Sequence, residues 1–278
     1  MSHPLFENVL TQNWASELSL NTNLSKFTEA IILWNKETFG NIFHRKRRVE
    51  ARLAGIQKAL ADGPNAHLLA LERVMREEYW VINQQEEDFW SVKSRYNWLI
   101  QGDRNTNFFH TSALIRRKRN RIFCFKDNSG DVIYNEEAIA ATIREGYISL
   151  FTTSKDCAPI SIWNVSSWSN RLSREEGELL NCTVTAKDVK DGLWSMKPFK
   201  ALGHDGIHAG FYQRNWNVVQ EVVVKEVCSI FSSGIMPCNL NRTLITLIPK
   251  CTGVDCLSLF RPISLCNTIY KIVTKIIV

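Results

Sequence analysis

Apolar side chains recur at alternating intervals of three and four residues in two successive stretches of this chain. The first stretch comprises Ile42, Val49, Leu53, Ile56 and Leu60, with Lys46 as a polar interruption. The second comprises Leu68, Leu71, Met75, Ile82, Phe89, Val92, Tyr96 and Leu99, interrupted by Glu78 and Gln85. A repeat of this kind is typical of helices that pair as a coiled coil.

The segment Asp62-Gly63-Pro64-Asn65 separates the two stretches and predicts a tight turn. Because so short a turn forces its two helices to lie antiparallel, the sequence predicts a long helical hairpin. Phe27, Ile31 and Trp34 extend the first apolar stripe toward the N-terminus. With this extension, we expect each arm to be roughly 50 Å long at about 1.5 Å per residue.

The next part of the chain mixes short elements. Residues 105–115 predict a short helix, and residues 122–126 and 132–134 flank a glycine-containing turn, which predicts a β-hairpin. Asn135 is a candidate N-cap of the following helix. Residues 152–172 are rich in Ser, Thr and Asn and lack periodicity, so they predict a linker.

Two helix starts follow, because Ser173 with Glu176 and Thr185 with Asp188 fit the capping-box pattern. A long helix is predicted over residues 207–232.

A second β-hairpin is predicted near the end of the sequence. Thr243 to Ile248 alternates β-branched and apolar residues, which predicts a short buried strand that Pro249 ends. A loop then leads to an extended segment at Arg261-Pro262. Residues 267–278 predict a final helix.

Together these elements predict a mostly helical α+β fold. We expect N-terminal helices and the helical hairpin over 1–101, and a basic helix, β-hairpin and helix over 102–151. The linker over 152–172 then joins them to a mixed domain over 173–278.

Composition indicates a globular intracellular protein. The chain has 278 residues, a formal net charge of +6 and a pI near 8.9, which is compatible with nucleic-acid binding. Its eight cysteines form no Cys-x-x-Cys pair, so we expect reduced thiols. Cys251 and Cys256 are the nearest approach to a zinc motif and lack a matching second pair. We expect no membrane span.

The densest charge is the basic run Arg116, Arg117, Lys118, Arg119 and Arg121. Phe108, Phe109 and Phe123 flank it. One interpretation is a nucleic-acid backbone site with stacking groups beside it. The alternative is a solvated helix end whose cations complement the helix dipole.

Lys250 and Arg261 lie at the two ends of the loop in the second β-hairpin. They form a plausible clamp for phosphate, because Arg offers a planar fork and Lys a point charge. An ordinary hairpin with solvated ends fits the same spacing.

Several blocks carry a resemblance to a known family. Leu-Ile-Pro-Lys at 247–250 and Phe-Arg-Pro-Ile-Ser-Leu at 260–265 resemble the start of the reverse transcriptase domain of plant non-LTR (LINE-type) retrotransposons. Lys-Ala-Leu-Gly-His-Asp-Gly at 200–206 resembles the family's Lys-Ala-Pro-Gly-Pro-Asp-Gly, with Leu202 and His204 in place of its prolines. Gly-Asp-Arg-Asn-Thr-Asn-Phe-Phe-His at 102–110 resembles the segment joining its endonuclease to its polymerase.

This resemblance implies an RNA-directed DNA polymerase, a nucleotidyltransferase that works in the nucleus and uses Mg²⁺. It implies that 173–278 is the N-terminal fingers part of a right-hand polymerase fold. Lys250 and Arg261 would contact template or nucleotide phosphates, and Lys200 would join the basic run on the nucleic-acid backbone.

The sequence departs from this family in its carboxylates. Two-metal nucleotidyl transfer needs carboxylates that bridge two Mg²⁺ ions, but the sequence has no Asp-Asp pair and no acidic residue after Arg261. We therefore expect no catalytic residue, no bound metal or cofactor and no polymerase activity in this chain alone. It reads as truncated before the palm, so we expect Ile269, Ile272 and Ile276 to be exposed.

Adjacent His204 and Asp205 are candidates for a catalytic dyad, but Asp205 fits better as an N-cap of the next helix. The expected partners are template RNA and DNA, bound weakly and in a salt-sensitive manner. Two alternatives remain open. The helical hairpin is a protein-interaction module, or the chain is a functionless pseudogene product.

Overall fold

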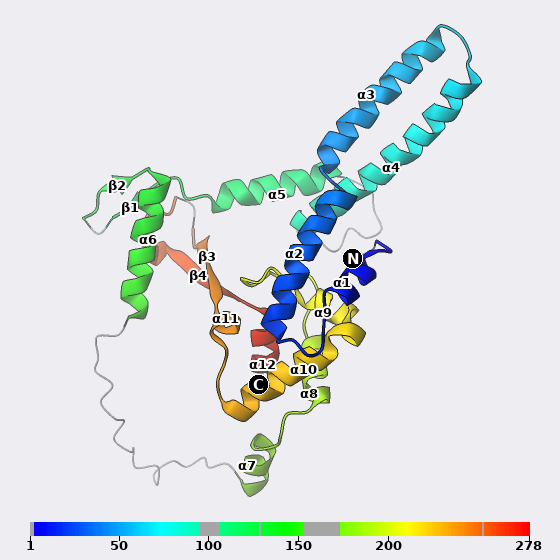
Figure 1. Cartoon of the computed structure of the whole chain (residues 1–278). Coiled ribbons are helices and arrows are strands. Elements are labelled where there is room, and N and C mark those ends of the chain that lie inside the picture. The colour runs from blue at the N-terminus through cyan, green and yellow to red at the C-terminus, as the bar shows by residue number, and fades with distance from the viewer. Residues whose placement is uncertain (1–2, 95–105, 128, 153–172, 252) are drawn as a thin grey trace. The chain divides into compact units, whose positions relative to one another are not determined.

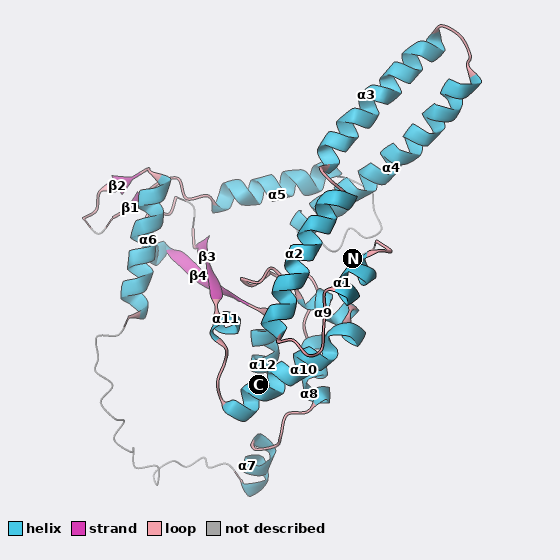
Figure 2. Cartoon of the chain, in the orientation of Figure 1, coloured by secondary structure: helices cyan, strands magenta, loops and turns pink. Residues whose placement is uncertain are grey.

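The structure is a computed structural model that describes residues 3–94, 106–127, 129–152, 173–251 and 253–278. Within these ranges the chain is mostly helical and carries two two-stranded antiparallel sheets (Figure 2), which confirms the mostly helical α+β class. Apart from Thr152, the linker predicted over 152–172 lies outside the described residues. No described helix combines the length and apolarity needed to cross a lipid bilayer.

The elements of Figure 1 have the following bounds. The helices are α1 Phe6–Gln12, α2 Leu20–Thr38, α3 Ile42–Ala61, α4 Ala66–Ser94, α5 Thr106–Asn120, α6 Glu136–Phe151, α7 Arg174–Leu180, α8 Ala186–Trp194, α9 Ala209–Arg214, α10 Trp216–Ser233, α11 Cys238–Asn241 and α12 Thr268–Ile277. The strands are β1 Phe125–Lys126, β2 Val132–Ile133, β3 Thr243–Pro249 and β4 Phe260–Cys266.

The chain divides into two compact units. One comprises Met1–Arg119, Met196–Ala201 and Ile207–Glu226, and the other comprises Asn120–Ser195, Leu202–Gly206 and Val227–Val278. Each unit therefore contains segments that are distant in the sequence.

In the first unit, α3 and α4 form the predicted helical hairpin (Figure 1). Val49, Ile56, Met75 and Ile82 are buried between the helices. The side-chain oxygen of Asn65 accepts hydrogen bonds from the backbone N–H groups of His67 and Leu68 and so caps α4.

The predicted arm length was wrong for the first arm, because α2 and α3 are separate helices. α2 ends at Thr38, Gly40 adopts a φ of +57°, and Asn41 accepts hydrogen bonds from the N–H groups of Phe43 and His44. A left-handed glycine followed by an asparagine N-cap stops one helix and starts the next. α3 has 20 residues and α4 has 29, about 30 and 44 Å.

The polar residues that interrupt the apolar stripes make ion pairs or hydrogen bonds across the hairpin. Lys46 Nζ lies 2.6 Å from Glu86 Oε2, and the Arg45 guanidinium lies 3.7 Å from Glu78 and 3.5 Å from the Gln85 oxygen. Burial disfavours the charged form of Lys46, but its hydrogen bond and attraction to Glu86 outweigh this and raise its pKa. These contacts fix the register of α3 against α4.

An aromatic cluster joins the N-terminal helices to α9. Phe211 lies with its ring centroid 5.0 Å from that of Phe27 and 6.3 Å from that of Trp14. The amide of buried Asn23 donates to the carbonyl of Ala15 at 2.8 Å and accepts from its N–H at 2.9 Å. This exchange holds the turn between α1 and α2.

The long helix predicted over 207–232 is interrupted. α9 ends at Arg214, and the buried side chain of Asn215 donates to the carbonyl of Phe211 at 2.8 Å before α10 begins. His208, and not Asp205, is at the N-cap position of α9, so the predicted cap was wrong.

In the second unit, a small apolar core joins both β-hairpins to α6. Phe125 of β1, Ile139 of α6 and Phe260 of β4 are buried together, and Leu247 of β3 packs against them. Asn135 caps α6, and both predicted capping boxes are present at α7 and α8. These three local helix-start signals of the sequence are therefore confirmed.

The C-terminal helix α12 is packed rather than exposed. Ile269 and Ile272 are fully buried and Ile276 is half-buried, because α12 lies against α8. A methyl group built on Gly192 of α8 would lie 3.6 Å from both Ile272 and Ile276. The expected exposure of this helix was wrong.

The loop at 202–206 is held against the start of α12 by Asn267. The Asn267 amide oxygen accepts from the Asp205 N–H at 3.3 Å, and its nitrogen donates to the Asn239 carbonyl at 3.2 Å. A Cβ at Gly203 would lie 2.6 Å from the Asn267 backbone nitrogen, so only glycine fits there.

We predict that Gly203→Ala lowers the free energy of unfolding by about 1–3 kcal/mol, because the added methyl group collides with backbone atoms. Gly55→Ala is the matched control. Its methyl group would enter open space within α3 and should raise stability by about 0.5–1 kcal/mol. Urea unfolding followed by circular dichroism measures both. Equal stability of Gly203→Ala and the wild type contradicts the packing described above.

We predict that His208 makes the chain less stable in acid. Burial against Phe199 lowers its pKa, and its Nδ1 has no hydrogen-bond partner among the described residues. A lowered folded-state pKa means that the unfolded chain binds the proton more readily. The contribution of neutral His208 to the free energy of unfolding is therefore fully present above the unfolded-state pKa of about 6.5. It is lost progressively as the pH drops below that value.

Urea unfolding at several pH values between 7 and 5 tests this. His208→Gln should flatten the fall in stability, whereas His67→Gln, at an exposed position, should leave it unchanged. Equal pH dependence of His208→Gln and the wild type is the contrary result.

Candidate nucleic-acid interface

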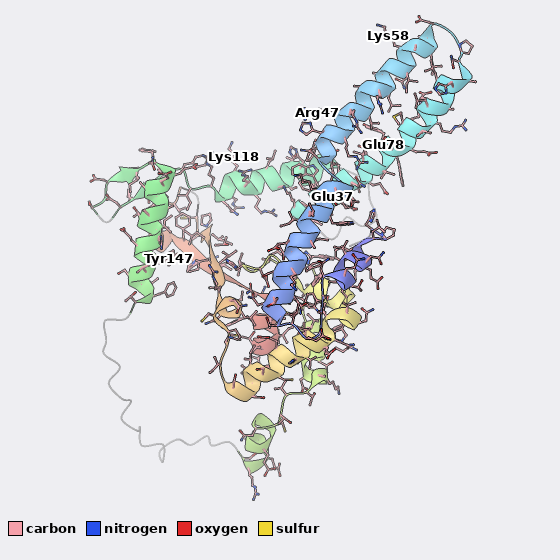
Figure 3. All side chains as sticks on the ribbon, in the orientation of Figure 1. Glu37, Arg47, Lys58, Glu78, Lys118 and Tyr147 are labelled. Carbon is pink, nitrogen blue, oxygen red and sulfur yellow. The ribbon has the colours of Figure 1, made fainter. Side chains whose placement is uncertain are left out.

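Four of the five cations in the basic run predicted to follow a short helix lie within helix α5 itself. α5 extends from Thr106 to Asn120, and Arg117, Lys118 and Arg119 occupy its exposed last turn. Figure 3 labels Lys118 on this helix. Three cations at a helix C-terminus stabilise the helix through its dipole, whether or not they also bind a ligand. Their exposure leaves the side chains accessible to a phosphate.

Arg116 has a different place from the other members of the run. Its guanidinium donates to the backbone carbonyl of Ser94 at 2.9 Å and also to that of Lys93. These carbonyls belong to the last turn of α4, where backbone acceptors have no partner within the helix. Arg116 therefore ties α5 to the end of α4 and is committed to the fold.

An aromatic group surrounds this junction. The rings of His110 and Trp90 have centroids 4.3 Å apart, and Lys93 Nζ lies 4.1 Å from the centre of the Phe89 ring. Phe109 is buried. Of the predicted stacking groups, Phe109 thus belongs to the core, whereas Phe108 and Phe123 are exposed.

Arg121 follows α5 and pairs with Glu136 at 2.5 Å, while its guanidinium lies 5.3 Å from the Phe123 ring. Both charged groups of this pair are exposed, so it contributes little to stability and exchanges readily for another anion. Lys200 is exposed in the loop between α8 and α9, and no described contact joins it to α5.

Lys250 and Arg261 are brought together by the register of the second hairpin. Arg261 pairs with Ile248 across β3 and β4, and the Lys250 N–H donates to the Leu259 carbonyl at 2.9 Å. Ile248 and Lys250 are two residues apart, so the side chains of Lys250 and Arg261 lie on one face of the ladder.

Lys250 also closes its own loop, because its Nζ donates to the Ser258 carbonyl at 2.6 Å. Two of its three N–H groups are left for another acceptor. Arg261 is exposed. Lys250 is therefore anchored at the loop, and the exposed guanidinium of Arg261 lies on the same face of the ladder.

The face that carries these cations is apolar and exposed, so the predicted burial of β3 was wrong. Leu244 is 45% exposed and Ile263 40%, and Ile248 is also exposed. The opposite face, through Leu247 and Phe260, packs on the core shared with α6. Alternation in the sequence predicts a two-faced strand but does not say which faces are covered.

The other candidate residues form no site. Cys251 is exposed, and Cys256 is half-buried with its Sγ 3.3 Å from the Ser258 hydroxyl. Within the described ranges no group of three His, Cys, Asp or Glu side chains is arranged to hold a metal ion.

The sequence did not predict the anchoring role of Arg116 or the charged seam at Arg45 and Lys46. A signal for the seam was present, since Lys46 and Glu78 interrupt apolar stripes of opposite helices. The role of Arg116 has no such local signal, because its partners lie more than twenty residues away.

Comparison with known proteins supports a transposon relationship. No protein-family model matches the chain. The chain is 27% identical over 186 residues to a protein of Xenopus laevis described as "Transposon TX1 uncharacterized 149 kDa protein". The match covers 67% of this chain and 14% of that protein, so the chain spans about one-seventh of the relative's length.

We predict that the basic run divides into structural and free cations. Arg116→Gln should lower the free energy of unfolding by about 1–3 kcal/mol, because two backbone carbonyls lose a charged donor. The triple change of Arg117, Lys118 and Arg119 to Gln should stay within about 0.5 kcal/mol of the wild type. Urea unfolding compares them, and a larger loss in the triple variant contradicts this division.

Proposed function

We propose that this chain is part of a LINE-type RNA-directed DNA polymerase and that it binds nucleic acid. The observation that carries the proposal is the similarity to a transposon protein over 67% of the chain. The blocks at 200–206, 247–250 and 260–265, which resemble those of a reverse transcriptase of this class, add support. The plant branch of the family and work in the nucleus are proposed from the motifs alone.

The placement of the cations supports nucleic acid as the partner. Arg117, Lys118 and Arg119 are exposed at the end of α5, and Phe108 is exposed on the same helix. Arginine forks and lysine point charges suit phosphate oxygens, and an exposed aromatic ring offers a base a stacking surface.

The hairpin of β3 and β4 supports a second contact with the same partner. Its exposed face ends in Lys250 and Arg261, while Leu244, Ile248 and Ile263 extend it as an apolar surface. Such a surface suits the flat face of a base or sugar, and the cations at its end suit the adjoining phosphate. We propose that this face contacts template or incoming nucleotide.

Catalysis by these 278 residues alone is not part of the proposal. Two-metal nucleotidyl transfer needs a cluster of carboxylates, and the described residues do not offer one. The donor set therefore does not fit Mg²⁺, and we derive no chemical step through it. The metal-binding carboxylates would belong to a longer polymerase.

We predict salt-sensitive binding without polymerisation. Fluorescence anisotropy with a 20-nucleotide single strand should give an affinity that falls as salt rises. The triple change of Arg117, Lys118 and Arg119 to Gln should reduce the slope of log affinity against log salt by about 2, at about 0.7 per lost phosphate contact. A primer annealed to RNA should not be extended when Mg²⁺ and nucleotides are added.

The control removes the same charge elsewhere, at exposed Arg73, Arg174 and Lys187. If the salt slope falls equally in this control, the effect is due to net charge, and the proposed binding site on α5 is wrong. Mg²⁺-dependent extension by the purified chain overturns the inactive assignment.

The second candidate function is a protein-interaction module formed by the helical hairpin. The observation that favours it is exposed apolar surface on α4, where Val74 is 55% and Val81 43% exposed. Changing Val74 and Val81 to Ser should then weaken partner binding while nucleic-acid binding persists.

A further inference from the structure

Charge is segregated between the two helices of the hairpin. α3 carries six Lys and Arg residues and one Glu, whereas α4 carries three Lys and Arg and six Asp and Glu. A hairpin held only by its apolar seam needs no such division. The excess of cations on α3 is therefore a property that the pairing of the helices does not account for.

The pairing uses two of the six cations. Arg45 and Lys46 form the ion pairs to Glu78 and Glu86. The remaining four, Arg47, Arg48, Arg52 and Lys58, are all exposed and form what we call the α3 cationic face.

Two members of this face, Arg47 and Lys58, point away from the partner helix. At about 100° per residue, Arg47 and Lys58 lie opposite the buried positions Val49 and Ile56, and Arg48 and Arg52 lie toward one flank. Figure 3 shows Arg47 and Lys58 on the outer side of α3 and Glu78 on the side of α4 that faces it. Arg47 contacts only its own helix, at the Phe43 carbonyl and the His44 ring, in the contacts described.

The helix surface between these cations carries only small side chains, so it lies close to the backbone and is called low. Ala51 and Gly55 lie between Arg47 and Lys58, and a Cβ at Gly55 would meet no atom within 4 Å. Glycine in a helix interior costs about 1 kcal/mol relative to alanine. No packing among the residues that the structure describes requires Gly55, so its position fits close approach of an external surface.

The dimensions of the face match a nucleic-acid backbone. Arg47 and Lys58 are separated by 11 residues of helix, about 16 Å. A duplex presents a phosphate about every 3.4 Å along each strand, so this length spans several phosphates. Phe43, the exposed aromatic residue of α3, packs edge-on against Phe89 with a centroid separation of 5.7 Å. Charge thus dominates the face, and its exposed ring, that of His44, lies against the Arg47 guanidinium, which favours a duplex over a single strand.

We propose that the α3 cationic face binds the phosphate backbone of duplex nucleic acid. The inference rests on the proposed function in taking nucleic acid as the partner of this chain. It adds a binding surface separate from α5 and from the hairpin of β3 and β4, and it assigns the helical hairpin to duplex rather than to a single strand.

The test uses the full chain and two probes, a 20-base-pair duplex and a 20-nucleotide single strand, in anisotropy titrations between 50 and 200 mM salt. In the first variant Arg47, Arg48, Arg52 and Lys58 are changed to Gln. The matched control changes Arg73, Arg144, Arg174 and Lys187 to Gln and so has the same net charge. Circular dichroism checks that both variants keep the wild-type helix content.

We expect the α3 variant to lower the salt slope for the duplex by about 3.6, at about 0.9 per phosphate contact. This corresponds to about 10²-fold less change in affinity between 50 and 200 mM salt. The slope for the single strand should change far less. The control should behave as the wild type with both probes.

A second pair of variants tests the low surface at the centre of the face. Gly55→Glu should weaken duplex binding about tenfold or more, by placing a carboxylate between the cations at low salt. Gly55→Ala should bind as the wild type does, because a methyl group leaves the surface low.

Three results overturn the inference. Equal slopes in the α3 variant and the control remove the site while leaving nucleic-acid binding in place. Poly-L-glutamate that binds as tightly as the duplex, with the same loss in the α3 variant, assigns the face to an acidic protein surface. Wild-type protein that binds neither probe removes the proposed function together with this site.

Discussion

The buried amide of Asn267 is the contact on which the second unit depends. It joins the loop at 202–206, the carbonyl of Asn239 in α11 and the start of α12, immediately after β4 ends. An amide can donate and accept at once, which an apolar side chain of the same size cannot do. Losing it would remove two part-buried hydrogen bonds, each of which contributes about 0.5–1.5 kcal/mol. Gly203 makes this contact possible, because a residue with a Cβ atom would collide with the Asn267 backbone.

This contact decides where the hairpin of β3 and β4 can lie. One end of the hairpin is fixed through Asn267, and its inner face is fixed by the packing of Phe260 with Phe125 and Ile139. The outer face, with Arg261, is then left exposed as a consequence of both restraints. The 202–206 loop is therefore held by the residue that directly follows β4 in the chain.

The sequence predicted features whose cause is local. The capping boxes at Ser173 and Thr185 and the turn before Asn65 depend on a few neighbouring residues, and all are present. The predictions from the sequence failed for features that depend on residues distant in the chain. Apolar alternation in β3 could not show that only one face is covered, and the arginine run could not show that Arg116 is committed to the carbonyls of α4. Periodicity names the residues that share a face, whereas tertiary contacts determine what that face meets.

The same distinction separates the cations of this chain by role. Arg45 and Lys46 have carboxylate partners in α4, in positions that are partly exposed, where an ion pair contributes at most about 1 kcal/mol. Their main effect is on register, because a shift of α3 by one turn would set Lys46 against apolar positions. A fixed register in turn fixes the rotation of α3, and with it the outward direction of Arg47 and Lys58. The weak ion pairs of the seam thus determine which cations remain for an external anion.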